Sequence, residues 1–175
     1  MFNSFSATAS EILAAAIHDY KRGSIIGSKQ TYGKGTVQNL IDLNQFVRSS
    51  SVGDLGALKT TTQKFYRING GSTQLEGVSS DIVMPDRYAY LKMGERDVEN
   101  AMPWDKIEPA IYETFNIPNF DDIILKSRAR LKESVQFSLI DDNAKWLSKR
   151  RDEHVYNLNL KKFEEEQKAI ELEIK

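Results

Sequence analysis

Two short stretches of this 175-residue chain contain side chains that could carry chemistry. The first runs from Ser6 to Glu11 and reads SATASE, with small residues and hydroxyls just ahead of an expected helix. The free amides and the positive dipole end of a helix N-terminus stabilise negative charge. A hydroxyl at that position could attack a carbonyl carbon while backbone amides receive the oxyanion. The structural alternative is that Thr8 and Glu11 form a capping box, in which each side chain binds the other's backbone amide.

The second stretch runs from Tyr32 to Gln38 and reads YGKGTVQ. Its two glycines permit a tight turn that presents Lys34. A lysine can act as a general base only if burial or neighbouring groups lower its pKa toward neutrality, and it would then take the proton from a nearby hydroxyl. The alternative is a solvated lysine in a turn, since lysine is rarely buried. A phosphate-binding loop fits less well, because GKGT lacks the first glycine of GxxxxGK(S/T) and does not open a helix.

Hydrophobic periodicity predicts the elements that hold these stretches in the first half of the chain. Apolar residues at 12, 13, 16, 17 and 20 recur at helical spacing, which predicts a helix over 10–20 with Gly23 as its C-terminal stop. Alternating and β-branched runs predict strands, and a strong turn signal follows the last of them at Asn69-Gly70-Gly71. The predicted strands are 24–26, 36–43 and 58–68, with a loop over 45–56.

The second half of the chain is predicted to be helical. Prolines at 103, 109 and 118 punctuate short pieces, helical spacing follows over 120–131, and 141–174 could form one long helix with breaks. All ten glycines lie at or before Gly94, and all four prolines lie at or after Pro85. This shift in composition predicts a boundary near 85–90, with domains over 1–86 and 87–175. The predicted fold class is α+β: a partial mixed α/β core of one helix and several strands, followed by an all-α C-terminal domain.

Composition argues against several other functions. The net charge of −1 gives no overall attraction to nucleic acid, so no nucleic-acid partner is expected. No stretch approaches the ~20 apolar residues of a membrane span. The chain has no cysteine, which excludes thiolate catalysis, and its two histidines lie far apart, which argues against a metal site. His18 is expected to be incidental to catalysis.

Taken together, the two stretches resemble the end of the protease core in C-terminal-processing peptidases. The matching segments are FSATASEILAAAIHDYKRGSIIGSKQTYGKGTVQN and TTQKFYRINGGSTQLEGVSSDIVMPD, and the second is similar to the tail-specific subgroup in particular. The similarity continues through AMPWDKIEPAIY into the helical half, which resembles the C-terminal domain of that subgroup. The resemblance covers nearly the whole chain and implies a serine-type endopeptidase of the serine/lysine kind.

The resemblance implies a role for five residues. The family nucleophile is a serine three residues before the glutamate of a SASASE-like motif, and Thr8 occupies that position here. The general base of the family corresponds to Lys34. Tail-specific members also use an aspartate that corresponds to Asp19, whereas other branches use a glutamine that corresponds to Gln38. The backbone amide of Ala9 would supply part of the oxyanion hole, and no metal or organic cofactor is implied.

Two departures from the family pattern leave alternative functions open. The methyl group of Thr8 makes its side chain stiffer than serine, and a misplacement of ~1 Å can lower a rate by on the order of 100-fold. Thr8 could therefore be a natural variant, a weakened nucleophile or a crippling substitution. In addition, the upstream helical region, the peptide-binding PDZ domain and the first part of the core are not visible in the sequence. We therefore expect a fragment that is inactive in isolation.

The first functional hypothesis is thus a segment of an endopeptidase that recognises the unstructured, apolar C-terminal tails of its protein substrates. Its partners would include the upstream PDZ and N-terminal regions of the full enzyme. The family resemblance implies a periplasmic or envelope location, although the chain itself has no visible export signal. The alternative is a catalytically dead remnant that acts as a binding or scaffold module, with an adaptor or a second copy as its partner.

Overall fold

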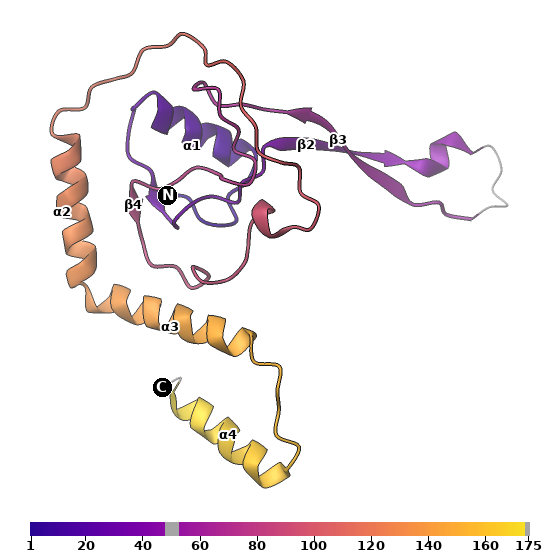
Figure 1. Ribbon diagram of the computed structural model, residues 1–175, viewed down its shortest axis with the longest axis vertical. Coiled ribbons are helices and arrows are strands. Elements are labelled where there is room, and N and C mark those ends of the chain that lie inside the picture. The colour runs from indigo at the N-terminus through magenta and orange to yellow at the C-terminus, as the bar shows by residue number, and fades with distance from the viewer. Residues whose placement is uncertain (48–52, 174–175) are drawn as a thin grey trace.

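The computed structural model describes residues 1–47 and 53–173, and it has a mixed α/β half followed by a helical half (Figure 1). Helix α1 (Ala9–Asp19) contributes Ala14 and Ala15 to a small core that also contains Ile25 and Val78. Strands β1 (Ile26–Gly27) and β4 (Ile82–Val83) pair in parallel beside this core. The predicted α+β class is confirmed.

Helix α1 matches the predicted helix to within one residue at each end, but the predicted stop at Gly23 is wrong. The helix ends at Asp19, and Lys21 adopts the left-handed conformation with φ 52°. Lys21 N–H donates to His18 O at 3.1 Å, and Arg22 N–H donates to Ile17 O at 2.9 Å. These two bonds form the Schellman motif, so a lysine occupies the position where glycine is usual.

The strand predictions are confirmed in part. β2 (Thr36–Asp42) matches the predicted 36–43, and it pairs antiparallel with β3 (Ala57–Lys64) in a hairpin that extends away from the body (Figure 1). β3 ends before the predicted 68, because Arg67 N–H donates to Gly71 O at 2.8 Å and closes the predicted turn at 69–71. The first predicted strand, 24–26, overlaps the observed strand β1 only at residue 26. Part of the predicted loop at 45–56 is a 3-10 helix, η1 (Leu43–Phe46), and residues 48–52 lie outside the described residues.

Residues 98–118 correct the prediction that the second half is all helical. Apart from the 3-10 helix η3 (Glu95–Asp97), the chain between β4 and residue 119 has no regular helix in the structure. It runs back over the α/β half, where Ala110 N–H donates to Ile68 O at 3.1 Å and Phe115 N–H donates to Tyr20 O at 2.9 Å. The prolines in this segment cannot donate a backbone hydrogen bond to a helix, which favours the extended course.

The described residues after 119 form three helices: α2 (Phe120–Glu133), α3 (Val135–Arg151) and α4 (Leu160–Glu173). The prediction over 120–131 is confirmed as α2. The predicted long helix over 141–174 is two helices, and α3 begins earlier than expected. The chain breaks at 152–159, where the Asn159 side chain accepts a hydrogen bond from Lys162 N–H at 3.3 Å and so caps α4.

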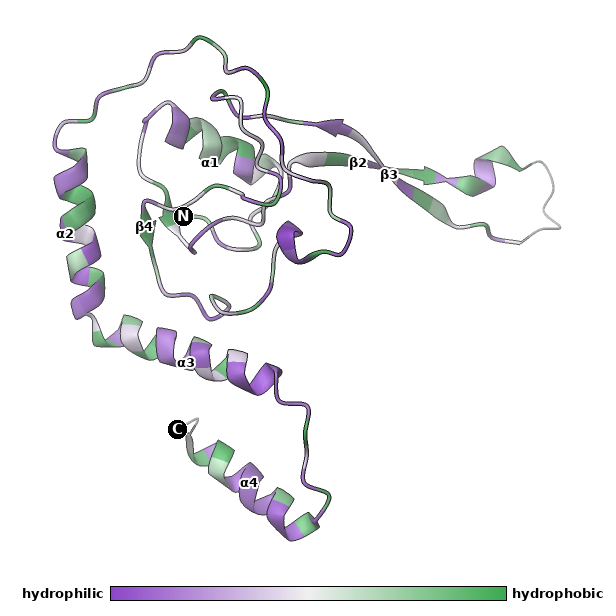
Figure 2. Cartoon of the chain, viewed as in Figure 1, coloured by the Kyte–Doolittle hydropathy of each residue, from purple (hydrophilic) through white to green (hydrophobic). Residues whose placement is uncertain are grey.

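Much apolar surface is left uncovered. The accessible surface is 12,838 Å², whereas a compact monomer of 19.9 kDa would expose about 8,700 Å². Exposed apolar side chains lie on α1, on the hairpin and on α2 to α4. Figure 2 shows hydrophobic residues along these elements. Among the described residues, no helix combines the length and the hydropathy needed to cross a membrane.

Candidate active site

Thr8, immediately before α1, has a strained backbone. Its φ is 49° and its ψ is −101°, outside the regions that are allowed for residues with a Cβ atom. The strain is greater for a β-branched residue, and such outliers persist only where the surrounding structure enforces them. The chain turns sharply at Thr8 from residue 7 into the helix.

A buried carboxylate enforces this turn and links it to the second stretch of interest. Glu11 has no exposed surface. Its Oε2 accepts hydrogen bonds from the backbone N–H of Thr8 at 3.0 Å and of Lys34 at 2.9 Å. Its Oε1 accepts from Gly33 N–H and from the Thr31 hydroxyl, both at 2.6 Å. The predicted capping box is present. Glu11 does more than cap the helix, because one carboxylate oxygen joins the backbones of Thr8 and Lys34.

The glycines around Lys34 are needed because the backbone is crowded there. Gly33 has φ 92°, and a Cβ atom on it would lie 2.9 Å from the backbone of Leu75. A Cβ atom on Gly35 would lie 2.6 Å from Ser72 Oγ. The loop therefore packs against residues 72–75 at a distance that only glycine permits.

The Lys34 side chain is half-buried and is held by the next strand. Lys34 Nζ donates a hydrogen bond to Gln38 Oε1 at 2.7 Å, and Gln38 Nε2 lies 3.5 Å from Thr61 Oγ1 on β3. The pairing of β2 with β3 is irregular between Val37 and Gln38. Such bulges redirect side chains and are common beside active sites. The amine is therefore fixed in position rather than free in solvent.

Ala9 is the first residue of α1 and is exposed. At this position a helix has no internal acceptor for the backbone N–H, which leaves the amide available to a ligand. The structure thus brings four of the five predicted residues into one region: Thr8, Ala9, Lys34 and Gln38. A hydroxyl, a free helix amide and an oriented amine are the groups that acyl transfer requires.

Asp19 lies at the opposite end of α1, about 16 Å from Thr8 along the helix axis. Arg67 binds its carboxylate with two N–H groups, of which Nε lies 2.9 Å from Oδ2. Asn69 Nδ2 and His18 Nδ1 each lie 3.3 Å from Oδ1. In this structure Asp19 joins α1 to the turn at 67–71, and a catalytic role for it stays a prediction.

Hydrogen bonds among His18, Asp19 and Arg67 shift the pKa values of the histidine and the aspartate. Burial acts to raise the pKa of Asp19, but hydrogen bonds with His18 and Arg67 outweigh burial and hold the pKa below its ordinary value. The hydrogen bond with Asp19 raises the pKa of His18, although burial acts in the opposite direction. His18 Nε2 also lies 3.9 Å from Asp81. His18 therefore belongs to an ion-pair cluster, away from Thr8 and Lys34.

Sequence reasoning missed two buried side chains that shape the site. Thr31 donates to Glu11 and accepts from Val78 N–H at 2.8 Å. Gln74 has no exposed surface and accepts from Gly35 N–H at 2.9 Å. Neither lies in a periodic segment, so hydrophobic pattern gives no signal for them. Within residues 1–47 and 53–173, no group of His, Asp or Glu residues is arranged to hold a metal ion.

Comparison with known proteins assigns both halves of the chain. The family model for Peptidase family S41 matches residues 1–84, and the model described as the C-terminal domain of tail specific protease matches residues 88–175. The chain belongs to the tail-specific proteases of this peptidase family. The family is one of serine-type peptidases that process C-termini, as the resemblance implied.

Three relatives show how far this similarity extends. The Tail-specific protease of Haemophilus influenzae is 45% identical over 166 residues, which are 92% of this chain and 24% of that protein. A Carboxy-terminal-processing protease of Bartonella bacilliformis is 41% identical over 92 residues, 50% of this chain and 19% of the relative. Carboxyl-terminal-processing peptidase 3, chloroplastic, of Arabidopsis thaliana is 34% identical over 82 residues, 47% of this chain and 14% of the relative. The chain thus spans about a quarter of the length of the Haemophilus relative and a smaller share of the other two relatives.

Proposed function

We propose that this chain carries the nucleophile and the general base of a tail-specific endopeptidase. The observation that carries the proposal is the strained backbone of Thr8, which a single buried carboxylate ties to the Lys34 loop. A threonine that only capped a helix would gain nothing from this conformation, because ordinary caps have extended backbones. Strain of this kind concentrates where a reacting group must be held in one orientation.

The proposed reaction is a two-step acyl transfer. The Thr8 hydroxyl oxygen attacks the carbonyl carbon of the scissile peptide, and the unprotonated amine of Lys34 accepts the hydroxyl proton. The Ala9 N–H donates to the oxyanion of the tetrahedral intermediate. The intermediate collapses, the C–N bond breaks, and Lys34 returns the proton to the leaving amine. Water then attacks the Thr8 ester by the same route and releases the acid.

The supporting side chains act through these groups. Gln38 orients the Lys34 amine by accepting its hydrogen bond, and Glu11 fixes the separation of the two reacting loops. Glu11 is a positioning residue in this scheme because it binds backbone amides and the Thr31 hydroxyl, and none of the groups that react. The reaction as written involves no metal or organic cofactor.

Substrate, partners and location are part of the proposal, and family membership supports them. The substrates would be proteins with unstructured, apolar C-termini, and upstream PDZ and N-terminal regions would recognise those tails and complete the core. The exposed apolar residues of α1 support such a neighbour. The enzyme would act in the periplasm or cell envelope. In this scheme the chain alone is inactive, because other parts of the core must complete the site.

The test is a Lys34→Ala change in the full-length polypeptide that contains this sequence. Hydrolysis of a fluorogenic peptide with an apolar free C-terminus should fall by at least about 100-fold, because general-base catalysis is worth that much. Lys29→Ala is the matched control, since Lys29 is an exposed lysine outside the site. Unchanged hydrolysis in Lys34→Ala would refute the lysine mechanism.

A scaffold role is the second candidate, favoured by threonine at the nucleophile position and by the large exposed surface. The two candidates differ because only the endopeptidase has a nucleophile that forms a covalent bond with a reactive probe. A fluorophosphonate probe that labels the native protein, but not a Thr8→Ala variant, would support the endopeptidase. A protein that retains a partner in pull-down and never reacts with the probe would support the scaffold.

A further inference from the structure

The Lys34 loop is held from two sides, and one of them belongs to the C-terminal half of the chain. We propose that Gln74 is a positioning residue for Lys34 and that it transmits support from residues 94–105, here called the strap. The proposal rests on the proposed function of Lys34. In this proposal the strap, which belongs to the C-terminal half of the chain, supports catalysis without contacting the substrate.

Gln74 makes the central connection. Its side chain is fully buried, and Oε1 accepts the hydrogen bond from Gly35 N–H, directly after Lys34, at 2.9 Å. Its Nε2 donates to Met102 O at 3.0 Å and to Glu95 Oε1 at 3.3 Å. One buried amide therefore links the Lys34 loop to two points on the strap. Because an unsatisfied buried amide is unfavourable, these bonds fix the side chain strongly.

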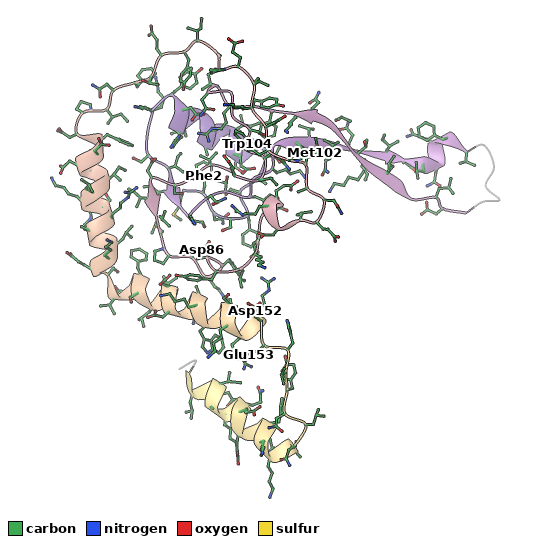
Figure 3. The ribbon with its side chains drawn as sticks, in the orientation of Figure 1. Phe2, Asp86, Met102, Trp104, Asp152 and Glu153 are labelled. Atoms are coloured by element: carbon green, nitrogen blue, oxygen red, sulfur yellow. The ribbon has the colours of Figure 1, made fainter. Side chains whose placement is uncertain are left out.

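Two further contacts tie the strap to the same loop and to Ser72, which in turn binds Gln74. Glu95 N–H donates to Tyr32 O at 3.0 Å, two residues before Lys34. Trp104 Nε1 donates to Ser72 O at 2.9 Å, and Ser72 Oγ accepts from Gln74 N–H at 3.0 Å. Met102 and Trp104, labelled in Figure 3, flank Pro103, whose carbonyl oxygen accepts a hydrogen bond from Lys64 Nζ at the end of β3 at 3.0 Å. The strap thus supports the Lys34 loop at Tyr32, which it contacts directly, and at Gly35, which it reaches through Gln74.

The Lys34 loop is held by contacts from two different parts of the chain. Glu11 of α1 holds the amides of Gly33 and Lys34, whereas Gln74 and the strap hold Gly35 and Tyr32. If the strap side is lost, the loop retains its bonds to α1 but can shift by a fraction of an ångström. Shifts of ~1 Å in a catalytic group lower rates by on the order of 100-fold. We therefore expect a loss of turnover rather than of substrate affinity.

The experiment compares turnover and KM in the full-length polypeptide with a fluorogenic peptide that has an apolar free C-terminus. Gln74→Ala should lower kcat by about 10- to 100-fold and leave KM within about threefold, the pattern expected when only transition-state positioning is lost. Glu95→Ala should lower kcat by a smaller factor, and Glu95→Gln, which keeps an acceptor for Gln74 Nε2, should restore it. Met102→Ala is the matched control, since Gln74 binds only the backbone oxygen of Met102.

Two outcomes would overturn the proposal. If Gln74→Ala and Glu95→Ala lower the melting temperature but leave kcat unchanged, Gln74 has a structural role alone. If Gln74→Ala does not fold, Trp104→Phe, which removes one N–H donor from the strap, decides instead, and an unchanged kcat there counts against the proposal. Lys34→Ala keeps the two claims apart. Full activity in Lys34→Ala refutes the proposed function, whereas a loss in Lys34→Ala without a loss in Gln74→Ala refutes only the role of Gln74.

Discussion

At the scale of single residues, the buried carboxylate of Glu11 accepts hydrogen bonds from the backbone amides of Thr8 and Lys34 and so fixes these two positions relative to each other. Thr8, Lys34 and Gln38 were predicted from two short motifs and lie in one region of the structure. The central role of Glu11 was not predicted, because its pattern at the helix start is satisfied by capping alone. Its bonds to Thr31 and Gly33 depend on a loop 20 to 22 residues away, and no local pattern specifies them.

Strain at Thr8 leads to a prediction about stability. Thr8→Gly should raise the free energy of unfolding by about 1 kcal/mol, because strained backbone of this kind costs about 1–3 kcal/mol and glycine relieves most of it. Loss of the capping side chain offsets only a few tenths of a kcal/mol. Urea denaturation measures the change. Thr8→Ala is the control, since it keeps the Cβ atom and should give no gain; equal stability in all three proteins would mean that the turn is unstrained.

At the scale of elements, the predicted helices and strands are right where the hydrophobic pattern is periodic. They are wrong where tertiary contacts determine the course of the backbone. The helices α1 and α2 and strand β2 have clear periodicity and lie where expected. The end of α1 was misjudged because Lys21 adopts a conformation usually left to glycine. The course of residues 98–118 could not be predicted, because it follows hydrogen bonds to Ile68 and Tyr20 that are distant in sequence.

The cluster that joins α1 to the turn at 67–71 should make stability depend on pH. The pKa of His18 is raised above 6.5 in the folded chain, so its contribution is present below pH 6.5 and is lost as pH rises through the folded value. The pKa of Asp19 is lowered below 3.8, so its contribution is present above pH 3.8 and is lost as pH falls through the folded value. Stability from this cluster is therefore greatest between these limits.

His18→Gln tests the upper limit. The urea midpoint of the native chain should fall as pH rises from about 6 to 8, since the unfolded state binds fewer protons than the folded state in that range. His18→Gln should remove that fall. His154→Gln, in the exposed segment between α3 and α4, should retain it. A fall of the same size in His18→Gln would assign the pH dependence to another group.

At the scale of the whole molecule, helix α1 carries two apolar side chains that the described residues leave largely uncovered. Ala14 and Ala15 are buried, but Ile12 and Leu13, on the same helix, are 49% and 57% exposed. The motif in front of them is that of a protease core, and the chain spans 24% of its Haemophilus relative. We infer that, in a longer polypeptide that carries the rest of the core, that core covers these two side chains.

This inference predicts that one substitution has different effects in two contexts. Ile12→Ser with Leu13→Ser should change the unfolding free energy of the 175-residue chain by no more than about 0.5 kcal/mol, as is usual for exposed positions. In the full-length polypeptide the same pair should destabilise by about 3 kcal/mol or more, because each buried side chain contributes about 1.5–3 kcal/mol. Ile25→Ala, at a buried core position, should destabilise both proteins. Equal effects of the double substitution in both contexts would show that α1 keeps this face exposed, and the upstream core would then have to join the site through the β2–β3 hairpin or the strap.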